Sequence, residues 1–538
     1  MGQDSQDVSR RDFLRTGTAL AAAPLSLTQV IKPNRFRADH TADIVIAGGG
    51  ASGLAAAVSA RDSGASVIVI DENHDFGGHA MLSGGRISLG GGNSWQKKWG
   101  IQDSIEQVFL DHTDHRNPLF KYSDRALVRM WSDENLPTLD FLLENGIRFN
   151  DVAPQKVWNE SVPRNFVAIR YSDNLAETIQ GRGGSGVVRP LEASARKKGA
   201  TFLASHKLVR LLSATPSAGP VYGVVAQHNG KDVTIRARKG VILCTGGHTS
   251  DVDFRRMFDP RLTEEYQVTG EPWSKQTAAG ERLAMAVGAV LWGTANQQNG
   301  LAITKTKHIG CRYGYVNLKW DPKSPMFPLA KATGLTVEDY QNLILVNQMG
   351  ARVWNEVDSS EAFFDACMGT NGATGGTGGG GPIWAIFDAD AAAREKWNTQ
   401  PPNVDPDGYF FSANTLAELA AKIANPYQRA SMPAATLEAA VARYNKFVDA
   451  GKDDDFAKPT PKYKIAKAPF YAAWSTPILH DTLTGLRINP KCQVIDLGGQ
   501  TIQGLYAAGE CAGGFGLHGL TRVLVFGRVA GREAARSA

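Results

Sequence analysis

The sequence is poor in cysteine and has no long apolar run. Five cysteines are spread over 538 residues, and no two of them stand in a C-x-x-C spacing. This scarcity excludes a disulfide scaffold, a zinc ribbon, a thioredoxin-type redox pair and a c-type haem attachment. We therefore expect no metal site. No stretch reaches the roughly 18 consecutive apolar residues of a transmembrane helix, so we expect no membrane-spanning segment.

Strong charge of either sign is also missing. The net charge is +5, and no run of lysine or arginine stands out, which argues against nucleic acid as a partner. Apolar residues make up 43% of the chain, as in an ordinary globular protein, and the length predicts two to four domains. The 57 glycines are in modest excess and gather in a few loops, which is typical of backbone that closely approaches a ligand.

The N-terminal segment is typical of an export signal. Residues 9–15 (SRRDFLR) match the twin-arginine motif, residues 19–30 are mildly apolar, and residues 21–23 are three alanines suited to cleavage. We interpret residues 1–40 as a twin-arginine signal and linker, and we expect a periplasmic or otherwise exported protein. Export after folding also explains why the chain needs no disulfides.

A nucleotide-binding unit follows the linker. Residues 42–46 and 66–70 read as buried strands, and residues 54–63 between them have a helical composition. The turn after the first strand has the G-x-G-x-x-G pattern, which brings backbone and a helix N-terminus to a pyrophosphate. Asp71, 23 residues after Gly48, suits the ribose hydroxyls. The first cofactor residues that this pattern predicts are Gly48, Gly50, Ala51, Ser52, Gly53, Asp71 and Glu72.

Further elements follow from periodicity and turn residues. We expect a helix over 123–145, strands over 221–227 and 233–237 joined by a hairpin at 228–231, and another strand over 241–243. Residues 369–381 are glycine-rich and predict a loop. A helix is expected from about residue 520 to 535. The simplest organisation is one nucleotide-binding domain built from both ends of the chain, with a second domain inserted.

Four ordered segments carry a resemblance to a known family. They are residues 77–85 (GGHAMLSGG), 244–248 (CTGGH), 504–510 (GLYAAGE) and 525–531 (VFGRVAG). Together they resemble the fumarate reductase/succinate dehydrogenase flavoprotein superfamily, which also includes the 3-ketosteroid dehydrogenases. The resemblance adds to the expected cofactor residues Gly78, His79, Ser83, Gly84, Gly85, Thr245, Gly246, Gly509, Glu510, Leu520 and Thr521.

The resemblance implies an α/β fold, with a Rossmann-type FAD-binding domain (βαβ with G-x-G-x-x-G) interrupted by an α+β capping domain. The corresponding ranges are 41–290 and 476–538 for the FAD-binding domain and 291–475 for the cap. It also implies hydride exchange between flavin N5 and a substrate carbon, with Glu510 near the ribityl or ribose hydroxyls. The final helix would point its N-terminus at the flavin pyrimidine. His79 lies about one position from the place of covalent attachment in succinate dehydrogenases, so we expect non-covalent FAD.

The catalytic positions follow the family only in part. His480, in the segment 480–486 (HDTLTGL), matches a substrate-binding histidine. The second histidine of the family falls on Asn299, and its proton-donating arginine falls on Ser360. We therefore expect a substrate other than fumarate or another small dicarboxylate.

The loop before the last helix allows two alignments. In one, His518 to Arg522 correspond to the family's H-G-x-N-R, and Arg522 binds a substrate carboxylate. In the other, His518 to Thr521 begin the flavin-facing helix, and that arginine is deleted. The second is favoured because its helix register runs unbroken into 526–528, so Arg522 would not be indispensable. The catalytic candidates are thus His480, His518, Arg522 and Tyr313 (with its neighbours Arg312 and Tyr315).

The predicted function is an exported FAD-dependent oxidoreductase that dehydrogenates or reduces a C–C bond of a small organic substrate. The alternatives are a 3-ketosteroid-type dehydrogenase, although the Y-P-G tract of those enzymes is absent, and a flavin-bearing electron-transfer subunit. A pyridine-nucleotide reductase is disfavoured, because no second G-x-G-x-x-G follows a strand. We expect electrons to be exchanged with a quinone, a cytochrome or oxygen.

Overall fold

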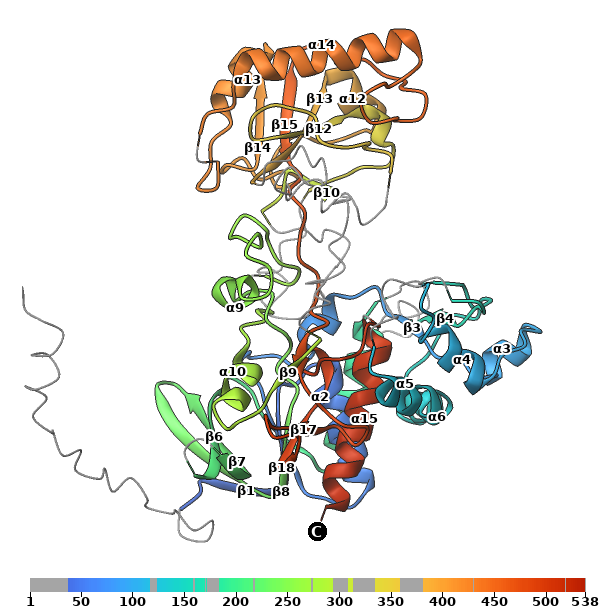
Figure 1. The fold of residues 1–538 in the computed structure, drawn as a ribbon, viewed down its shortest axis with the longest axis vertical. Helices are drawn as coiled ribbons and strands as arrows, with labels where there is room; N and C mark the ends of the chain where they lie inside the picture. The colour runs from blue at the N-terminus through green and yellow to red at the C-terminus, as the bar shows by residue number, and fades with distance from the viewer. Residues whose placement is uncertain are drawn as a thin grey trace, which may run out of the picture.

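The computed structural model describes residues 37–116, 123–157, 160–169, 171, 183–215, 218–271, 274–293, 308–312, 334–358, 381–428, 430–517 and 519–537. Figure 1 shows a larger α/β body at one end and a smaller body at the other. The proposed export signal, the glycine-rich loop at 369–380 and the candidates Tyr313 and His518 lie outside the described residues.

The larger body is built on an eight-stranded sheet. Five neighbouring strands are parallel, in the order β18 (Thr501–Ala507), β8 (Lys231–Leu243), β1 (His40–Ala47), β2 (Val67–Ile70) and β5 (Thr201–Leu203). The antiparallel strands are β17 (Gln493–Ile495), β6 (Lys207–Thr215) and β7 (Ala218–His228). β2 and most of β1 are buried and apolar, as expected of strands covered on both faces.

Three helices pack together beside the parallel strands: α2 (Ala51–Asp62), α8 (Ser185–Lys197) and α15 (Leu520–Arg536). α2 follows β1 near the start of the described chain, whereas α15 is the last element (Figure 1). Their pairing places the two ends of the described chain side by side. The larger body therefore contains both of these ends, with the smaller body inserted between them.

The smaller body is an antiparallel sheet in the order β12 (Ile344–Asn347), β13 (Ile383–Asp388), β15 (Phe470–Trp474) and β14 (Phe410–Ala413). Alternate strand residues point to opposite faces, and both faces are buried. One face packs under α13 (Leu416–Lys422) and α14 (Ala434–Ala450), and the other packs against α12 (Ala389–Arg394). This mixed architecture confirms the predicted fold class.

The remaining elements are short. They are η1 (Gly78–Leu82), β3 (Arg86–Ser88), α3 (Ser94–Lys98), α4 (Ile105–Asp111), β4 (Asn165–Val167), α9 (Val252–Arg256), α10 (Ala279–Met285), β9 (Leu291–Trp292), β10 (His308–Ile309), β11 (Leu335–Thr336), η3 (Tyr340–Asn342), β16 (Gly485–Leu486) and η4 (Gly509–Cys511). Within the described ranges, no helix combines the length and apolar character needed to cross a membrane.

Two predicted elements differ from the structure. The single helix expected over 123–145 is two helices, α5 (Arg125–Asp133) and α6 (Asn135–Glu144). Pro137 has no N–H to donate to the carbonyl of Asp133, so the chain restarts the helix at Asn135. The strands expected over 233–237 and 241–243 are one continuous strand, β8. The hairpin at 228–231 is confirmed, with Asn229 and Gly230 both at positive φ.

Candidate functional site

A cavity of about 360 Å³ opens in the larger body at the carboxyl ends of the parallel strands. Its walls come from four stretches of sequence that the fold brings together, within residues 48–88, 157–208, 244–279 and 480–523. No described residue of the smaller body lines it. Ligands of open α/β sheets bind at this edge, so the cavity is the candidate site.

The glycine turn after β1 forms the floor of the cavity. Gly48 has φ +101°, and a Cβ built on it would lie 2.1 Å from the carbonyl oxygen of Cys244. A Cβ on Gly53 would lie 1.9 Å from the oxygen of Gly48. Only glycine therefore permits this turn and the close approach of α2. The first turn of α2 has no side-chain cap and no acidic residue, so its N–H groups can bind an anion.

Asp71 lies at the end of β2 on the cavity wall. Its Oδ2 accepts the N–H of Gly49 at 2.7 Å, and its Oδ1 accepts that of Asn73 at 2.9 Å. Burial raises the pKa of Asp71 to about 6. The carboxylate is thus held between the glycine turn and the next loop, where each oxygen keeps a second lone pair for a ribose hydroxyl.

A series of side-chain hydrogen bonds runs along the middle of the cavity wall. The hydroxyl of Thr249 donates to Gln276 Oε1 at 2.7 Å, and Gln276 Nε2 donates to His79 Nδ1 at 2.7 Å and to Glu510. Because His79 Nδ1 accepts, its Nε2 carries the proton and donates to the carbonyl of Thr269. Burial lowers the pKa of His79 to about 4, so the ring is neutral.

Glu510 is the acidic residue in this series of hydrogen bonds. Burial is the largest cause that raises the pKa of Glu510 above its ordinary value, and the neighbouring carboxylate of Asp481 raises it further. Arg522 acts in the opposite direction. The Glu510 carboxyl therefore retains its proton to higher pH than an exposed glutamate, and it can both donate and accept a hydrogen bond.

The N-terminus of α15 reaches the far end of the cavity. Its first turn has no side-chain cap and no acidic residue, and Leu520 and Thr521 line the wall. Thr521 Oγ1 accepts the N–H of Ser88 at 2.7 Å, and Ser88 Oγ accepts from Asn165 Nδ2 at 3.1 Å. The antiparallel pair of β3 and β4 therefore lies on the cavity wall beside this helix end.

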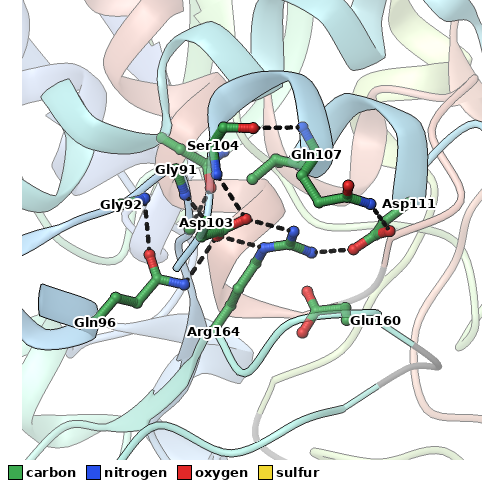
Figure 2. A network of polar contacts seen from close by, with 12 residues as sticks. Gly91, Gly92, Gln96, Asp103, Ser104, Gln107, Asp111, Glu160 and Arg164 are labelled. Carbon is green, nitrogen blue, oxygen red and sulfur yellow. Dashed lines mark hydrogen bonds and ion pairs between the residues drawn. The ribbon is translucent and has the colours of Figure 1, made fainter. Parts of the chain in front are cut away.

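A buried ion cluster adjoins the start of β4 (Figure 2). Arg164, which precedes β4, donates to Asp103 from Nε and Nη2 and to Asp111 Oδ2 from Nη1, at 2.6–2.9 Å. Glu160 belongs to the same cluster, and neither of its oxygens has a hydrogen-bond partner among the described residues. Burial raises the pKa of Glu160 to about 8, so this carboxyl is neutral at pH 7.

His480 is the catalytic candidate that reaches the cavity. Its side chain is 25% exposed, and its Nδ1 lies 3.3 Å from Oδ1 of the buried Asp481. The carboxylate fixes the orientation of the ring and leaves Nε2 on the opposite side. An imidazole held in this way by a carboxylate can transfer a proton to or from a bound substrate.

Arg522 does not line the cavity. It is the third residue of α15, its side chain is buried, and its guanidinium donates to the carbonyls of Thr482 and Ala512. α15 begins at Leu520, within the segment 518–521 where the second alignment starts the helix. The guanidinium binds backbone carbonyls in the described structure.

Most of the predicted cofactor residues lie on the cavity wall. These are Gly48, Gly50, Ala51, Ser52, Asp71, Glu72, Gly78, His79, Ser83, Gly84, Thr245, Gly246, Glu510, Leu520 and Thr521. Gly53, Gly85 and Gly509 stand behind the wall, and a Cβ on any of them would meet neighbouring atoms within 2.7 Å. These three glycines permit the close packing that shapes the wall.

Sequence reasoning missed several wall residues. Thr269 and Gln276 come from the loop before α10, and Ser88 and Asn165 come from strands of three residues each. None of them belongs to a recognisable motif. Only the pairing of β3 with β4, across 77 positions of sequence, brings Ser88 and Asn165 together.

The cavity fits an FAD molecule. Two uncapped helix N-termini suit the pyrophosphate and the pyrimidine, and Asp71 suits the ribose. Beside the cavity, the hydroxyl oxygens of Thr245 and Thr269 are buried and have no hydrogen-bond partner among the described residues. No cluster that could hold a metal ion occurs in the described ranges.

Residues 43–523 match the family described as "FAD binding domain". The chain is 26% identical to the NADH:acrylate oxidoreductase of Vibrio harveyi, over 92% of this chain and 50% of that protein, so it spans half the length of that relative. It is 27% identical to the acrylate reductase flavoprotein subunit of Shewanella woodyi, over 96% of this chain and 94% of that one. The open conformation of a flavocytochrome c3 fumarate reductase superposes with a TM-score of 0.67 at 22% identity, over 99% of this chain and 82% of that one.

The chain belongs to this FAD-binding family. Within it, the protein is an FAD-dependent oxidoreductase of the fumarate reductase-like superfamily, whose members act on carbon–carbon bonds. The resemblance seen in the sequence and the predicted cofactor are thereby confirmed.

Proposed function

We propose that the protein reduces the C=C bond of a small unsaturated acid that carries one carboxylate, with His480 as the proton donor. The observation that carries this proposal is the His480–Asp481 pair on the cavity wall. The names of two relatives, both of which act on acrylate, support a monocarboxylate. The burial of Arg522 against backbone carbonyls also disfavours a second carboxylate clamp.

The chemistry divides between the cofactor and the chain. When bound and reduced, FAD would supply the hydride that adds to the β-carbon of the acid. His480 Nε2 delivers a proton to the α-carbon, where the electron pair of the former C=C bond forms the new C–H bond and completes the saturated product. Asp481 stabilises the imidazolium before transfer, and the wall segments exclude water from the reacting carbons. The reverse reaction uses His480 as the base.

The test compares His480→Gln with the wild-type holoenzyme, with reduced viologen as electron donor and acrylate as substrate. A positioned general acid typically contributes 10²–10⁴-fold, so we expect kcat to fall by about that factor. The bound flavin spectrum should be unchanged. His115→Gln, at a position whose side chain is 91% exposed, is the matched control. Wild-type turnover by His480→Gln would refute the assignment.

An anaerobic titration identifies the substrate class. The reduced enzyme is mixed with acrylate, fumarate, larger unsaturated acids and ketosteroids, and reoxidation of the flavin is followed by absorbance. We expect a response to a monocarboxylate and none to fumarate. A response only to ketosteroids would favour a steroid dehydrogenase, and no response at all would favour an electron-transfer subunit.

We also propose that the flavin is held without a covalent bond. Both ring nitrogens of His79 are engaged in hydrogen bonds, Nδ1 with Gln276 and Nε2 with Thr269, so neither is available to attack the flavin. Precipitation of the holoenzyme with acid should release all of the flavin into the supernatant. Flavin that remains in the washed pellet would contradict this proposal.

Export through the twin-arginine pathway, with electron exchange to a quinone, a cytochrome or oxygen, completes the proposal. Residues 9–15 carry the motif that supports it. Replacing Arg10 and Arg11 by lysine should retain the folded flavoprotein in the cytoplasm, as measured by fractionation. Unchanged export of this variant would refute the assignment.

A further inference from the structure

Arg522 connects three segments that meet at the cavity. It lies in the first turn of α15, its Nη1 donates to the carbonyl of Thr482 at 3.2 Å, and its Nη2 donates to the carbonyl of Ala512. Thr482 follows the His480–Asp481 pair, and Ala512 follows Glu510. A single buried guanidinium thus fixes the loop that carries the proposed acid, the turn that carries the buried glutamic acid, and the flavin-facing helix end.

The charged groups around Arg522 belong to the candidate site. Asp481 and Glu510 interact with it electrostatically and favour its charged form, in opposition to burial, which lowers the pKa of Arg522. A cation in the first turn of a helix is disfavoured by the helix dipole. The two carboxyl groups and the two carbonyls compensate for this cost, so the arginine belongs to the site and not to the helix surface.

Each carboxyl group beside Arg522 has its own contact with the cavity wall. Asp481 orients His480 through the 3.3 Å contact, and Glu510 accepts from Gln276, which also donates to His79. A change of charge or position at Arg522 therefore affects both the His480–Asp481 pair and the hydrogen bonds of Glu510, although Arg522 does not line the cavity.

We propose that Arg522 is a positioning residue that sets the orientation of the His480–Asp481 pair, and that it does not bind the substrate carboxylate. This inference rests on the proposed function, since it takes His480 as the proton donor that Arg522 helps to position.

The experiment uses Arg522→Gln and Arg522→Lys holoenzymes with acrylate and reduced viologen, or with the unsaturated acid that the wild-type enzyme reduces fastest. We expect kcat to fall about tenfold or more in both variants, because neither side chain holds both carbonyls in the geometry of the guanidinium. KM should change by less than about threefold, because an interaction that orients the acid without touching the substrate contributes little to KM.

The split between kcat and KM is a readout that a merely structural role would not give, because a general loss of structure lowers FAD content and thermal stability together with kcat. Arg532→Gln, on the same helix and paired with Glu134, is the control, with kcat and KM unchanged.

The opposing outcomes are distinct. A KM raised tenfold or more with kcat unchanged would make Arg522 a carboxylate clamp and overturn the proposal, and so would unchanged kcat and KM. If Arg522→Gln fails to retain FAD, the kcat and KM of Arg522→Lys decide between the two roles. Failure of the proposed function appears separately, as wild-type turnover in His480→Gln.

Discussion

Glu160 is a buried carboxyl whose protonation affects stability. Its folded pKa is raised to about 8 by burial, whereas the ordinary value is 4.5. The folded chain therefore keeps a proton that the unfolded chain releases between these pH values, so stability falls as pH rises through this window. Among the described residues, the charged or titratable groups around it are Asp103, Asp111, His112 and Arg164.

We predict that Glu160→Gln removes this pH dependence. The amide keeps the neutral shape of the acid, so melting temperatures of variant and wild type should agree near pH 5. They should diverge in favour of the variant by a few degrees near pH 8.5. Glu144→Gln, on the exposed face of α6, is the matched control. Parallel melting curves of Glu160→Gln and wild type at all pH values would contradict the prediction.

Asp71 offers a second prediction at this scale. Replacement by Asn removes the charge that accepts the ribose hydroxyls but leaves an oxygen for Gly49 or Asn73. A hydrogen bond to a charged group contributes about 1.5–3 kcal/mol, so we expect FAD to bind roughly tenfold or more weakly. Fluorescence titration of the apoprotein measures this affinity. The exposed Asp62→Asn should bind as wild type, and equal affinity of Asp71→Asn would contradict the assignment.

At the scale of elements, α2 and α15 touch backbone to backbone. A Cβ on Gly527 would lie 2.3 Å from the oxygen of Ser52, and a Cβ on Gly531 would lie 2.2 Å from the oxygen of Ala56. The second contact lies about one helical turn after the first on both helices. Neither glycine position has room for a side chain larger than hydrogen. This crossing fixes the direction of two helices whose N-termini both face the cavity.

We predict that Gly531→Ala loosens this crossing. Overpacking of a buried contact costs about 1–3 kcal/mol, and the displaced helix ends should also weaken FAD binding. Melting temperature and FAD affinity measure the two effects. Gly498→Ala, whose added methyl would meet only the Asp496 side chain, should leave both unchanged. Wild-type stability and affinity in Gly531→Ala would show that the helices tolerate separation.

The elements differ in how well the sequence predicts them. β1, α2 and β2 follow from local pattern, because apolar runs and the glycine turn determine both the strand ends and the ligand site. The break between α5 and α6 could also be read from Pro137, but the helical periodicity on either side conceals it. Ser88 and Asn165 could not be found, because three-residue strands carry no periodic signal and their pairing depends on tertiary structure.

The same limit applies to Arg522. The sequence supplied two alignments with different roles for this residue, and local pattern favoured one helix register without showing what the guanidinium contacts. Its partners are backbone carbonyls of residues 40 and 10 positions away, which no side-chain motif records. His480 was found because its segment keeps a family spacing, whereas its orientation by Asp481 required the structure.

At the scale of the whole molecule, the described part of the FAD cavity lies in one body. All described residues of the cavity wall belong to the larger body, and the antiparallel body stands apart from it (Figure 1). A ligand that binds the folded state alone raises its stability by mass action, by about 2.7 kcal/mol at a concentration of one hundred times Kd. We therefore expect added FAD to stabilise the larger body selectively.

Hydrogen exchange of the apoprotein and holoenzyme tests this expectation. Amides of β1, α2 and α15 should exchange at least tenfold more slowly with FAD, whereas those of β13 and α14 should be unaffected. Equal protection of both bodies would show that they unfold as one cooperative unit.

The pairing of α2 with α15 has a consequence for biosynthesis. The helix that completes the cofactor site leaves the ribosome only after the whole inserted body has been made. Until then, the nascent chain has the glycine turn and Asp71 but lacks the Glu510 turn and the second helix end, so FAD can be captured only once α15 has been made. Every molecule that carries FAD is therefore one whose translation has passed α15.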